Sequence, residues 1–222
     1  EDTPGKTLLL CGALCNNAFF DKEEKGNGEP TELALLTAAK NASLLRTPPE
    51  SLFPRLAEYP FDSARKCMST LHRYNGKSGA TLPSMPEDTY GFLVCKGAPE
   101  VVLSRCSYRY DNGVVRPLTA PALQDMTAYC NRCAERALRV LAVAYRPFSE
   151  ASCRKYLNTE QPQAGAESEL ILLGFLCLMD PPRPEVSRAV KECVRAGIKP
   201  VMITGDNKIT AEAIAKTVGI SG

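Results

Sequence analysis

The chain has 222 residues, of which 44% are hydrophobic and 23% are charged, and its 27 basic and 25 acidic side chains give a formal net charge of +2. This composition is ordinary for a soluble globular protein, and the near balance of charge gives no reason to expect nucleic acid or an anionic membrane surface as a partner. The longest apolar run, at 170–179, is about half the length that a membrane-spanning helix needs, and the N-terminus lacks the pattern of a signal peptide.

The first part of the chain is expected to mix helices with antiparallel strands. Apolar residues spaced three or four apart predict helices at 8–17 and 30–41, with a polar loop between them. Strands around a turn are predicted within 59–74, and an apolar strand at 90–96. The elements predicted next are a helix at 99–106, a turn at 111–113, a helix at 118–136, a strand at 138–145, a loop at 158–169 and a strand at 170–179.

The pattern changes at the Asp-Pro-Pro sequence of 180–182, which forbids a helix before it and sets a rigid bend. A helix at 184–196, a strand at 201–203 and a helix at 209–218 are predicted to follow. Helix–strand–helix is typical of a parallel α/β domain, but one strand cannot form a sheet. We therefore predict an α+β domain at 1–179, an antiparallel sheet flanked by helices, followed by an incomplete α/β segment at 180–222.

The ten cysteines do not have the density of a disulfide scaffold, and several lie inside apolar runs, so we expect reduced thiols. Cys130 and Cys133 form a Cys-x-x-Cys pair that could be half of a metal site or a redox pair. A zinc site needs four ligands, however, and the chain has no second pair of this kind. The single histidine, His72, is expected at the surface. No metal site is predicted.

Three residues after the strand predicted at 201–203 could contact a phosphoryl group. Ligands bind at the carboxyl ends of strands in open parallel sheets, and a helix N-terminus favours phosphate. Thr204 and the Gly205 amide could then contact the phosphoryl oxygens. Asp206 could help to control the charge of the phosphoryl group or bind its Mg²⁺. The alternative is a plain turn at the strand end in which Asp206 or Asn207 caps a helix.

Two segments could contact a nucleotide. Lys96 ends a strand, and Gly97 after it permits a close approach of backbone and ligand, although an exposed lysine at a strand end explains the pattern as well. Phe61 could stack on adenine and Arg65 could bind phosphate. The alternative places Phe61 in the core and Arg65 in solvent. Arg139 lies in an apolar strand, so it must face solvent, a carboxylate or an anionic ligand.

Several motifs, taken together and in this order, resemble the cytoplasmic headpiece of type II P-type ion-pumping ATPases. The motifs are Cys-Gly-Ala-Leu-Cys-Asn at 11–16, Gly-Glu-Pro-Thr-Glu at 28–32, Lys-Gly-Ala-Pro-Glu at 96–100, Asp-Pro-Pro-Arg at 180–183 and Thr-Gly-Asp-Asn-Lys at 204–208. The resemblance covers nearly the whole chain, and the segments at 138–145 and 180–183 are most similar to calcium pumps.

This resemblance implies a nucleotide-binding domain at 1–179, then a hinge and the beginning of a phosphorylation domain with a haloacid-dehalogenase-like fold at 180–222. It implies that Glu32 and Phe61 contact adenine and that Lys96 forms the inner wall of the pocket. Thr204, Gly205 and Asp206 would lie beside the acceptor aspartate, and Arg139 and Arg183 would meet the phosphates and ribose. The complete set of expected nucleotide-binding residues is Glu32, Phe61, Arg65, Lys96, Gly97, Arg139, Asp180 and Arg183.

Two motifs of that family are absent from the sequence. These are Asp-Lys-Thr-Gly-Thr, which holds the phosphorylated aspartate, and the Gly-Asp-Gly-x-x-Asn-Asp loop, which completes the Mg²⁺ site. The chain is therefore expected to bind ATP, with Mg²⁺ accompanying the nucleotide, but to be catalytically inactive alone. Its expected partners are the phosphorylation, actuator and transmembrane domains of a pump, and its expected location is the cytoplasmic face of a membrane.

Two other functions remain open on the sequence alone. A free-standing phosphatase of the haloacid dehalogenase type would need its own nucleophilic aspartate at a strand end. A non-catalytic interaction domain would have kept the fold and lost the ligand.

Overall fold

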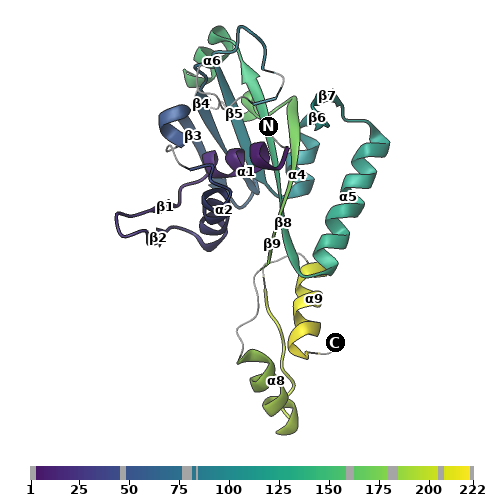
Figure 1. Cartoon of the computed structure of the whole chain (residues 1–222). Helices are drawn as coiled ribbons and strands as arrows, with labels where there is room; N and C mark the ends of the chain where they lie inside the picture. Colours follow the sequence, from purple (N-terminus) through teal and green to yellow (C-terminus); the bar gives the residue numbers. More distant parts are fainter. Residues whose placement is uncertain are drawn as a thin grey trace. The chain divides into compact units, whose positions relative to one another are not determined.

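The computed structural model describes residues 4–45, 49–76, 82–83, 85–158, 163–179, 185–204 and 208–220. The chain divides into two compact units (Figure 1). Unit 1 comprises Glu1–Leu123 and Leu141–Leu176, and unit 2 comprises Gln124–Val140 and Cys177–Gly222. Within the described residues, no helix is long and apolar enough to cross a membrane.

A mixed sheet of seven strands, counted over the described residues, forms the centre of unit 1, in the order β3-β4-β5-β8-β9-β6-β7. Four neighbouring pairs are antiparallel, namely β3–β4, β4–β5, β5–β8 and β6–β7, whereas β6 and β9 are parallel. The predicted α+β class is therefore confirmed, whereas the sheet, predicted to be antiparallel, is mixed and only mostly antiparallel. The strands are β3 (Arg55–Asp62), β4 (Cys67–Arg73), β5 (Gly91–Gly97), β6 (Cys106–Asp111), β7 (Val114–Pro117), β8 (Leu138–Phe148) and β9 (Leu170–Met179).

The central strands β4 and β5 have side chains buried on both faces of the sheet. Side chains alternate between the two faces along a strand. The register therefore places Lys96, Thr70 and His72 on one face, and Ser69 and Cys95 on the other. Helices α1 (Pro4–Leu14) and α2 (Pro30–Asn41) cover the first face, which we call the α1 face (Figure 1).

Aromatic rings fill the core of unit 1. Phe53, Phe92 and Tyr145 are fully buried, and the Phe53 and Phe92 rings meet edge to face with their centroids 5.3 Å apart. Between the two helices, Ala13 and Leu36 belong to a second apolar cluster. Burial of these apolar surfaces is the main force that holds the helices on the sheet.

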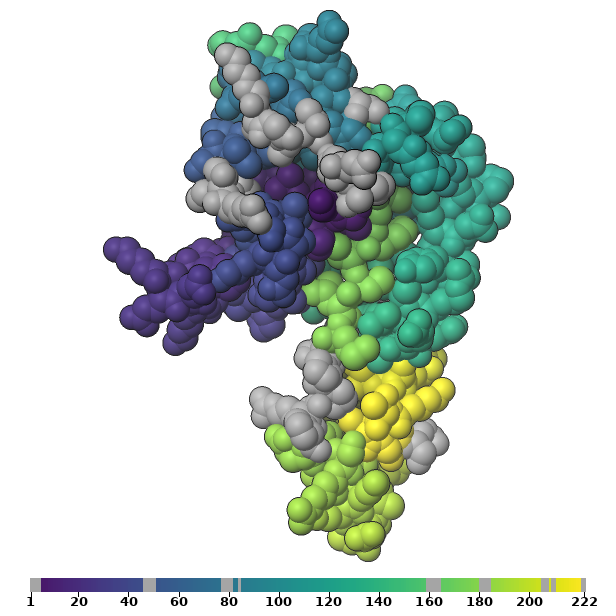
Figure 2. Space-filling model, viewed as in Figure 1, coloured from purple at the N-terminus to yellow at the C-terminus, as the bar shows by residue number. Residues whose placement is uncertain are grey.

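Short elements complete unit 1. Asn112 and Gly113 both have positive φ angles, 47° and 92°, which is the conformation that an Asn-Gly turn adopts between paired strands. The turn predicted at 111–113 is therefore confirmed, and it joins β6 to β7. The hairpin of β1 and β2 projects from the unit (Figures 1 and 2). The remaining elements are β1 (Phe19–Phe20), β2 (Gly26–Asn27), α3 (Pro49–Leu52), α4 (Pro99–Ser104), α6 (Glu150–Leu157) and α7 (Gln163–Ala166).

Unit 2 contains most of α5 (Ala120–Glu135), together with α8 (Val186–Arg195) and α9 (Lys208–Val218). Gly197 and Gly219 follow α8 and α9 with φ angles of 76° and 90°. The amide of the residue after each glycine donates to a carbonyl five residues earlier, which is the Schellman arrangement that ends many helices. The two helices predicted in this region are therefore confirmed.

The strand predicted at 201–203 is not formed. Val201 and Ile203 are 74% and 94% exposed, and no described segment pairs with them. An extended segment needs a neighbouring strand to satisfy its backbone hydrogen bonds, so an apolar run alone does not make it a strand.

Candidate functional site

A buried ion pair joins the end of β5 to the beginning of α2. Lys96 Nζ lies 3.0 Å from Glu32 Oε1, and the two side chains are only 6% and 15% exposed. Glu32 is in the first turn of α2, where the helix N-terminus favours a negative charge. A buried charge is costly without a partner, so each of these side chains depends on the other. Two residues expected around adenine are therefore in direct contact.

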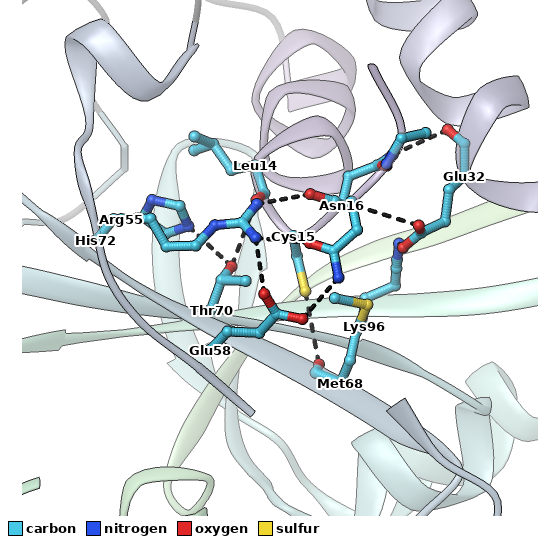
Figure 3. A network of polar contacts seen from close by, with 12 residues as sticks. Leu14, Cys15, Asn16, Glu32, Arg55, Glu58, Met68, Thr70, His72 and Lys96 are labelled. Atoms are coloured by element: carbon cyan, nitrogen blue, oxygen red, sulfur yellow. Dashed lines mark hydrogen bonds and ion pairs between the residues drawn. The ribbon is translucent and has the colours of Figure 1, made fainter. Parts of the chain in front are cut away.

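The segment after α1 fixes the position of Glu32 (Figure 3). The Asn17 amide donates to Glu32 Oε2 at 3.2 Å, and Asn16 Nδ2 donates to the Glu32 carbonyl oxygen at 2.9 Å. Asn16 Oδ1 in turn accepts from the Ala18 amide at 2.7 Å. Among the described residues each carboxylate oxygen of Glu32 thus has one partner, and each can accept a further hydrogen bond from a ligand.

Arg55 on β3 holds this segment in place (Figure 3). Its Nη2 donates to the carbonyl oxygens of Leu14 and Asn16 at 3.1 and 2.6 Å, so it satisfies carbonyls at the end of α1. Its Nη1 donates to Asn17 Oδ1 at 2.7 Å and to Glu58 Oε2 at 3.1 Å. Sequence reasoning missed Arg55, Asn17 and Glu58. The available signal was an Asn-Asn pair directly after an apolar helix, and such pairs are common at turns without any function.

His72 lies beneath the same segment and is 0% exposed, so the expectation of a surface histidine is wrong. Burial lowers the pKa of His72 to about 4, against the opposing effect of its hydrogen bond to the Phe53 carbonyl oxygen. The ring is therefore neutral. A carbonyl can only accept, so Nδ1 carries the proton and donates to Phe53 at 3.0 Å, while Nε2 accepts from the Thr70 hydroxyl at 2.8 Å.

Phe61 is 62% exposed at the end of β3, so the alternative that places it in the core does not hold. The next residue, Asp62, accepts hydrogen bonds from the amides of Ala64 and Arg65 at 2.8 and 3.0 Å and so shapes the β3–β4 turn. Asp62 pairs with Cys67 on β4, and Cys67 pairs with Gly97 on β5. Phe61 and Lys96 therefore lie at the same end of three neighbouring strands.

Gly97 permits close packing of the protein on itself. A Cβ atom at Gly97 would lie 2.5 Å from Lys66 O and 2.5 Å from Cys67 Cβ, which is closer than such atoms approach in proteins. The next amide, that of Ala98, donates to Lys66 O at 2.9 Å. The glycine that the sequence suggested for approach to a ligand thus lets β5 approach the turn that carries Phe61.

Arg65 lies in a different cluster, on the face of the sheet opposite to Lys96. It pairs with the carboxylate of Glu167, which also pairs with Arg105 and accepts from the Ser69 hydroxyl at 2.6 Å. The Glu167 side chain is 2% exposed. A cavity of about 590 Å³ borders this cluster and is lined by Arg65, Ser104, Arg105, Ser107, Glu167, Ser168 and Glu169.

The charges of that lining cancel, since two arginines face two glutamates. Glu167 also occupies both guanidinium groups, so neither is a free cation that waits for a phosphate. The structure does not bring Arg65 together with Lys96 and Glu32.

The remaining predicted residues lie elsewhere or are not described. Arg139 and Thr204 are exposed and belong to unit 2. Gly205, Asp206, Asp180 and Arg183 lie outside the described residues. Within the described part of the chain, no group of three or more His, Cys, Asp or Glu side chains is placed to hold a metal ion.

The α1 face of the sheet therefore offers a carboxylate, an ammonium group and, at the same strand ends, an exposed aromatic ring. A planar base with amino donors and ring nitrogens can stack on such a ring and hydrogen-bond to such charged groups. The set is suited to binding, and burial raises the pKa of the nearby Cys15 thiol to about 11, which keeps this thiol in its unreactive protonated form.

Comparison with known proteins identifies the family. Residues 5–185 match the family described as P-type ATPase, cytoplasmic domain N, and the chain belongs to this family. A calcium-transporting ATPase of Bacillus subtilis is 40% identical over 219 residues, which cover 97% of this chain and 22% of the relative. Calcium-transporting ATPase 1 of Lactococcus lactis is 36% identical over 215 residues, with the same two coverages.

A relative named for other ions also matches. The sodium/potassium-transporting ATPase subunit alpha of Hydra vulgaris is 33% identical over 229 residues, which cover 97% of this chain and 21% of that protein. The chain thus spans about a fifth of the length of the curated relatives it matches.

Proposed function

We propose that the chain is the ATP-binding unit of a P-type ATPase that transports a cation, in which it presents MgATP for phosphoryl transfer to an aspartate. The observation that carries the proposal is the buried Lys96–Glu32 pair at the same strand ends as the exposed Phe61, in a chain that belongs to the N domain family. The Asp-Lys-Thr-Gly-Thr motif, which would hold this aspartate, does not occur in the sequence.

In this proposal adenine stacks on Phe61 and its amino group donates to the carboxylate of Glu32. Lys96 forms the inner wall of the pocket and holds Glu32 through their ion pair. Asn17 and Arg55 hold Glu32 in one position before the base arrives, which lowers the entropy cost of binding. Gly97 acts indirectly, through the packing of the turn that carries Phe61.

The proposal also assigns roles to the two parts of the chain and to residues beyond Glu32, Phe61 and Lys96. Residues 1–179 would form the nucleotide-binding domain, and 180–222 a hinge and the start of a phosphorylation domain of the haloacid dehalogenase type. Asp180, Arg183 and Arg139 would meet the phosphates and ribose, with Thr204, Gly205 and Asp206 beside the acceptor aspartate. Mg²⁺ would arrive with ATP.

The other domains of the pump would be the partners of this chain, at the cytoplasmic face of a membrane. The chain alone would not turn over ATP. Calcium is the proposed ion, because relatives from several bacteria carry that name at 34–40% identity. The sodium/potassium-transporting relative in Hydra vulgaris shows that this part of the sequence is shared among pumps named for different ions.

The first test is a titration of the chain with ATP and with AMP-PNP, followed by amide chemical shifts. We expect the largest changes at Glu32, Phe61 and Lys96. Phe61→Ala should weaken binding by about 1–3 kcal/mol, the value of one stacked base. Phe19→Ala is the matched control, because Phe19 is a similarly exposed phenylalanine (59% against 62%) on the β1–β2 hairpin.

Two results would contradict the proposal in different ways. If millimolar ATP left all shifts unchanged, the chain would be an interaction domain without a nucleotide. If the chain instead released phosphate steadily from a small phosphomonoester, it would be a phosphatase. A phosphatase of this type would also need its own nucleophilic aspartate at a strand end.

A further inference from the structure

Two thiols that are distant in sequence meet in unit 2. Cys133 is in the last turn of α5 and Cys177 is near the end of β9, and their sulfur atoms are 3.9 Å apart although 44 residues separate them. The Tyr129 hydroxyl contacts both sulfur atoms. Cys133 is 7% exposed, whereas Cys177 is exposed to solvent.

A metal ion does not account for this cluster. Cys130 lies one turn before Cys133 on α5, so three thiols are within one region. Over the described residues, however, no three such side chains are arranged around a common point. What the geometry offers is a pair of sulfur atoms 3.9 Å apart.

We propose that Cys133 and Cys177 are a site of reversible disulfide formation that fixes β9 to α5 when the chain is oxidised. A disulfide needs both proximity and access for the oxidant. Cys67 and Cys95 also contact each other, but both are 0% exposed in the sheet. Cys133 and Cys177 combine a short sulfur–sulfur distance with one solvent-exposed thiol.

The chemistry balances with a peroxide as oxidant. The Cys177 thiolate attacks one oxygen of hydrogen peroxide, the O–O bond breaks, and the sulfur becomes a sulfenic acid while the leaving hydroxide takes a proton to form water. The Cys133 thiolate then attacks the sulfenic sulfur and displaces hydroxide, which is also protonated. In total, two thiols and one peroxide give one disulfide and two water molecules. Thiol reductants reverse the bond by exchange.

Desolvation and the contact with Cys133 raise the pKa of the Cys177 thiol above its ordinary value. The reactive thiolate is therefore scarce at neutral pH, and the site is expected to respond to sustained oxidation.

The bond would act at the end of β9. Cys177 is two residues before Met179, the last residue of the strand, and the sequence continues directly into Asp-Pro-Pro-Arg. A covalent tie at Cys177 limits local opening of this strand end. It also restricts the unfolded chain by closing the loop between 133 and 177.

The experiment treats the 222-residue chain with hydrogen peroxide, blocks the remaining thiols, digests with trypsin without a reductant and maps linked peptides by mass spectrometry. Cleavage after Arg132 separates Cys130 from Cys133, so the two possible partners of Cys133 are resolved. We expect the peptide of 133–136 to be linked to the peptide that holds Cys177, and dithiothreitol to release it. No linked peptide, or a link from Cys130 to Cys133, would overturn the proposal.

Variants and a second readout test the same site. Cys177→Ser should abolish the link, whereas Cys193→Ser, at a partly exposed thiol on α8, should leave it intact. Oxidation should slow amide hydrogen exchange at 177–179 severalfold in the unsubstituted chain and should have no such effect in Cys177→Ser. Equal exchange in the oxidised and reduced chain would refute the claim that the bond fixes β9. Nucleotide binding is not needed for either result.

Discussion

The pH dependence of stability should reveal the buried His72. Its pKa is lowered from the ordinary 6.5 to about 4, first by desolvation and also by the charge of Arg55. The unfolded chain therefore binds a proton at this ring over a range in which the folded chain does not. Stability from the neutral ring is fully present above pH 6.5 and is lost as the pH falls toward 4.

The size of the effect follows from the two pKa values. At about 1.4 kcal/mol per pH unit, their separation corresponds to about 3 kcal/mol of unfolding free energy. Carboxylates also titrate between pH 4 and 6.5, so the total change is not specific to His72. His72→Asn removes the titration and keeps an amide that can donate to the Phe53 carbonyl oxygen, as Nδ1 does.

The assay is urea unfolding of both proteins from pH 4 to 7. The unsubstituted chain should lose about 3 kcal/mol more than His72→Asn over this range. Because the chain has a single histidine, its ring resonances also report the pKa directly by NMR. A ring that titrates near 6.5, or two proteins with parallel pH profiles, would refute the reasoning.

Two further substitutions test the packing around the candidate site by urea unfolding. Glu167→Gln removes the charge of a buried carboxylate that pairs with two arginines. The arginine side chains are 22% and 25% exposed, so solvent offsets part of the loss. We expect about 2 kcal/mol of destabilisation. Glu169→Gln, at a 64% exposed carboxylate, should be nearly neutral, and equal effects would contradict the role of Glu167. Gly97→Ala should cost about 1–3 kcal/mol through its clash with Lys66 O and Cys67. Gly5→Ala, with open space around it, should cost nothing, and an equally stable Gly97→Ala would show that the turn can move away.

Periodicity in the sequence predicted the larger elements of the fold. Long apolar runs predicted β5 and β9, and glycines predicted the ends of α8 and α9. These features are local, because the residues that form the element also determine it. The pairing of β6 with β9 could not be predicted, since it depends on contacts between distant segments. A strand was wrongly predicted at 201–203, because no segment among the residues that the structure describes pairs with this apolar run.

The candidate site shows the same limit at the level of single residues. Lys96 and Glu32 were each predicted to contact a nucleotide, and their mutual ion pair is a tertiary contact that neither segment reveals. Arg55 and Asn17 act on Glu32 from two other segments, again through contacts that have no local pattern. His72 was assigned to the surface because it precedes an arginine, whereas its position on the α1 face of β4 buries it.

The stretch from Phe61 to Arg65 looked like one binding motif, but the turn divides it into two roles. Arg65 anchors the turn to Glu167 on one side, and Lys66 anchors it through the hydrogen bond from the Ala98 amide on the other. Phe61 is therefore an exposed ring on a backbone that is held at two points. A ring held in this way loses little freedom when a base stacks on it, so more of the stacking energy is available for affinity. If a base stacks on Phe61 as proposed, Arg65 would contribute from the opposite face of the sheet, by fixing the turn rather than by touching a phosphate.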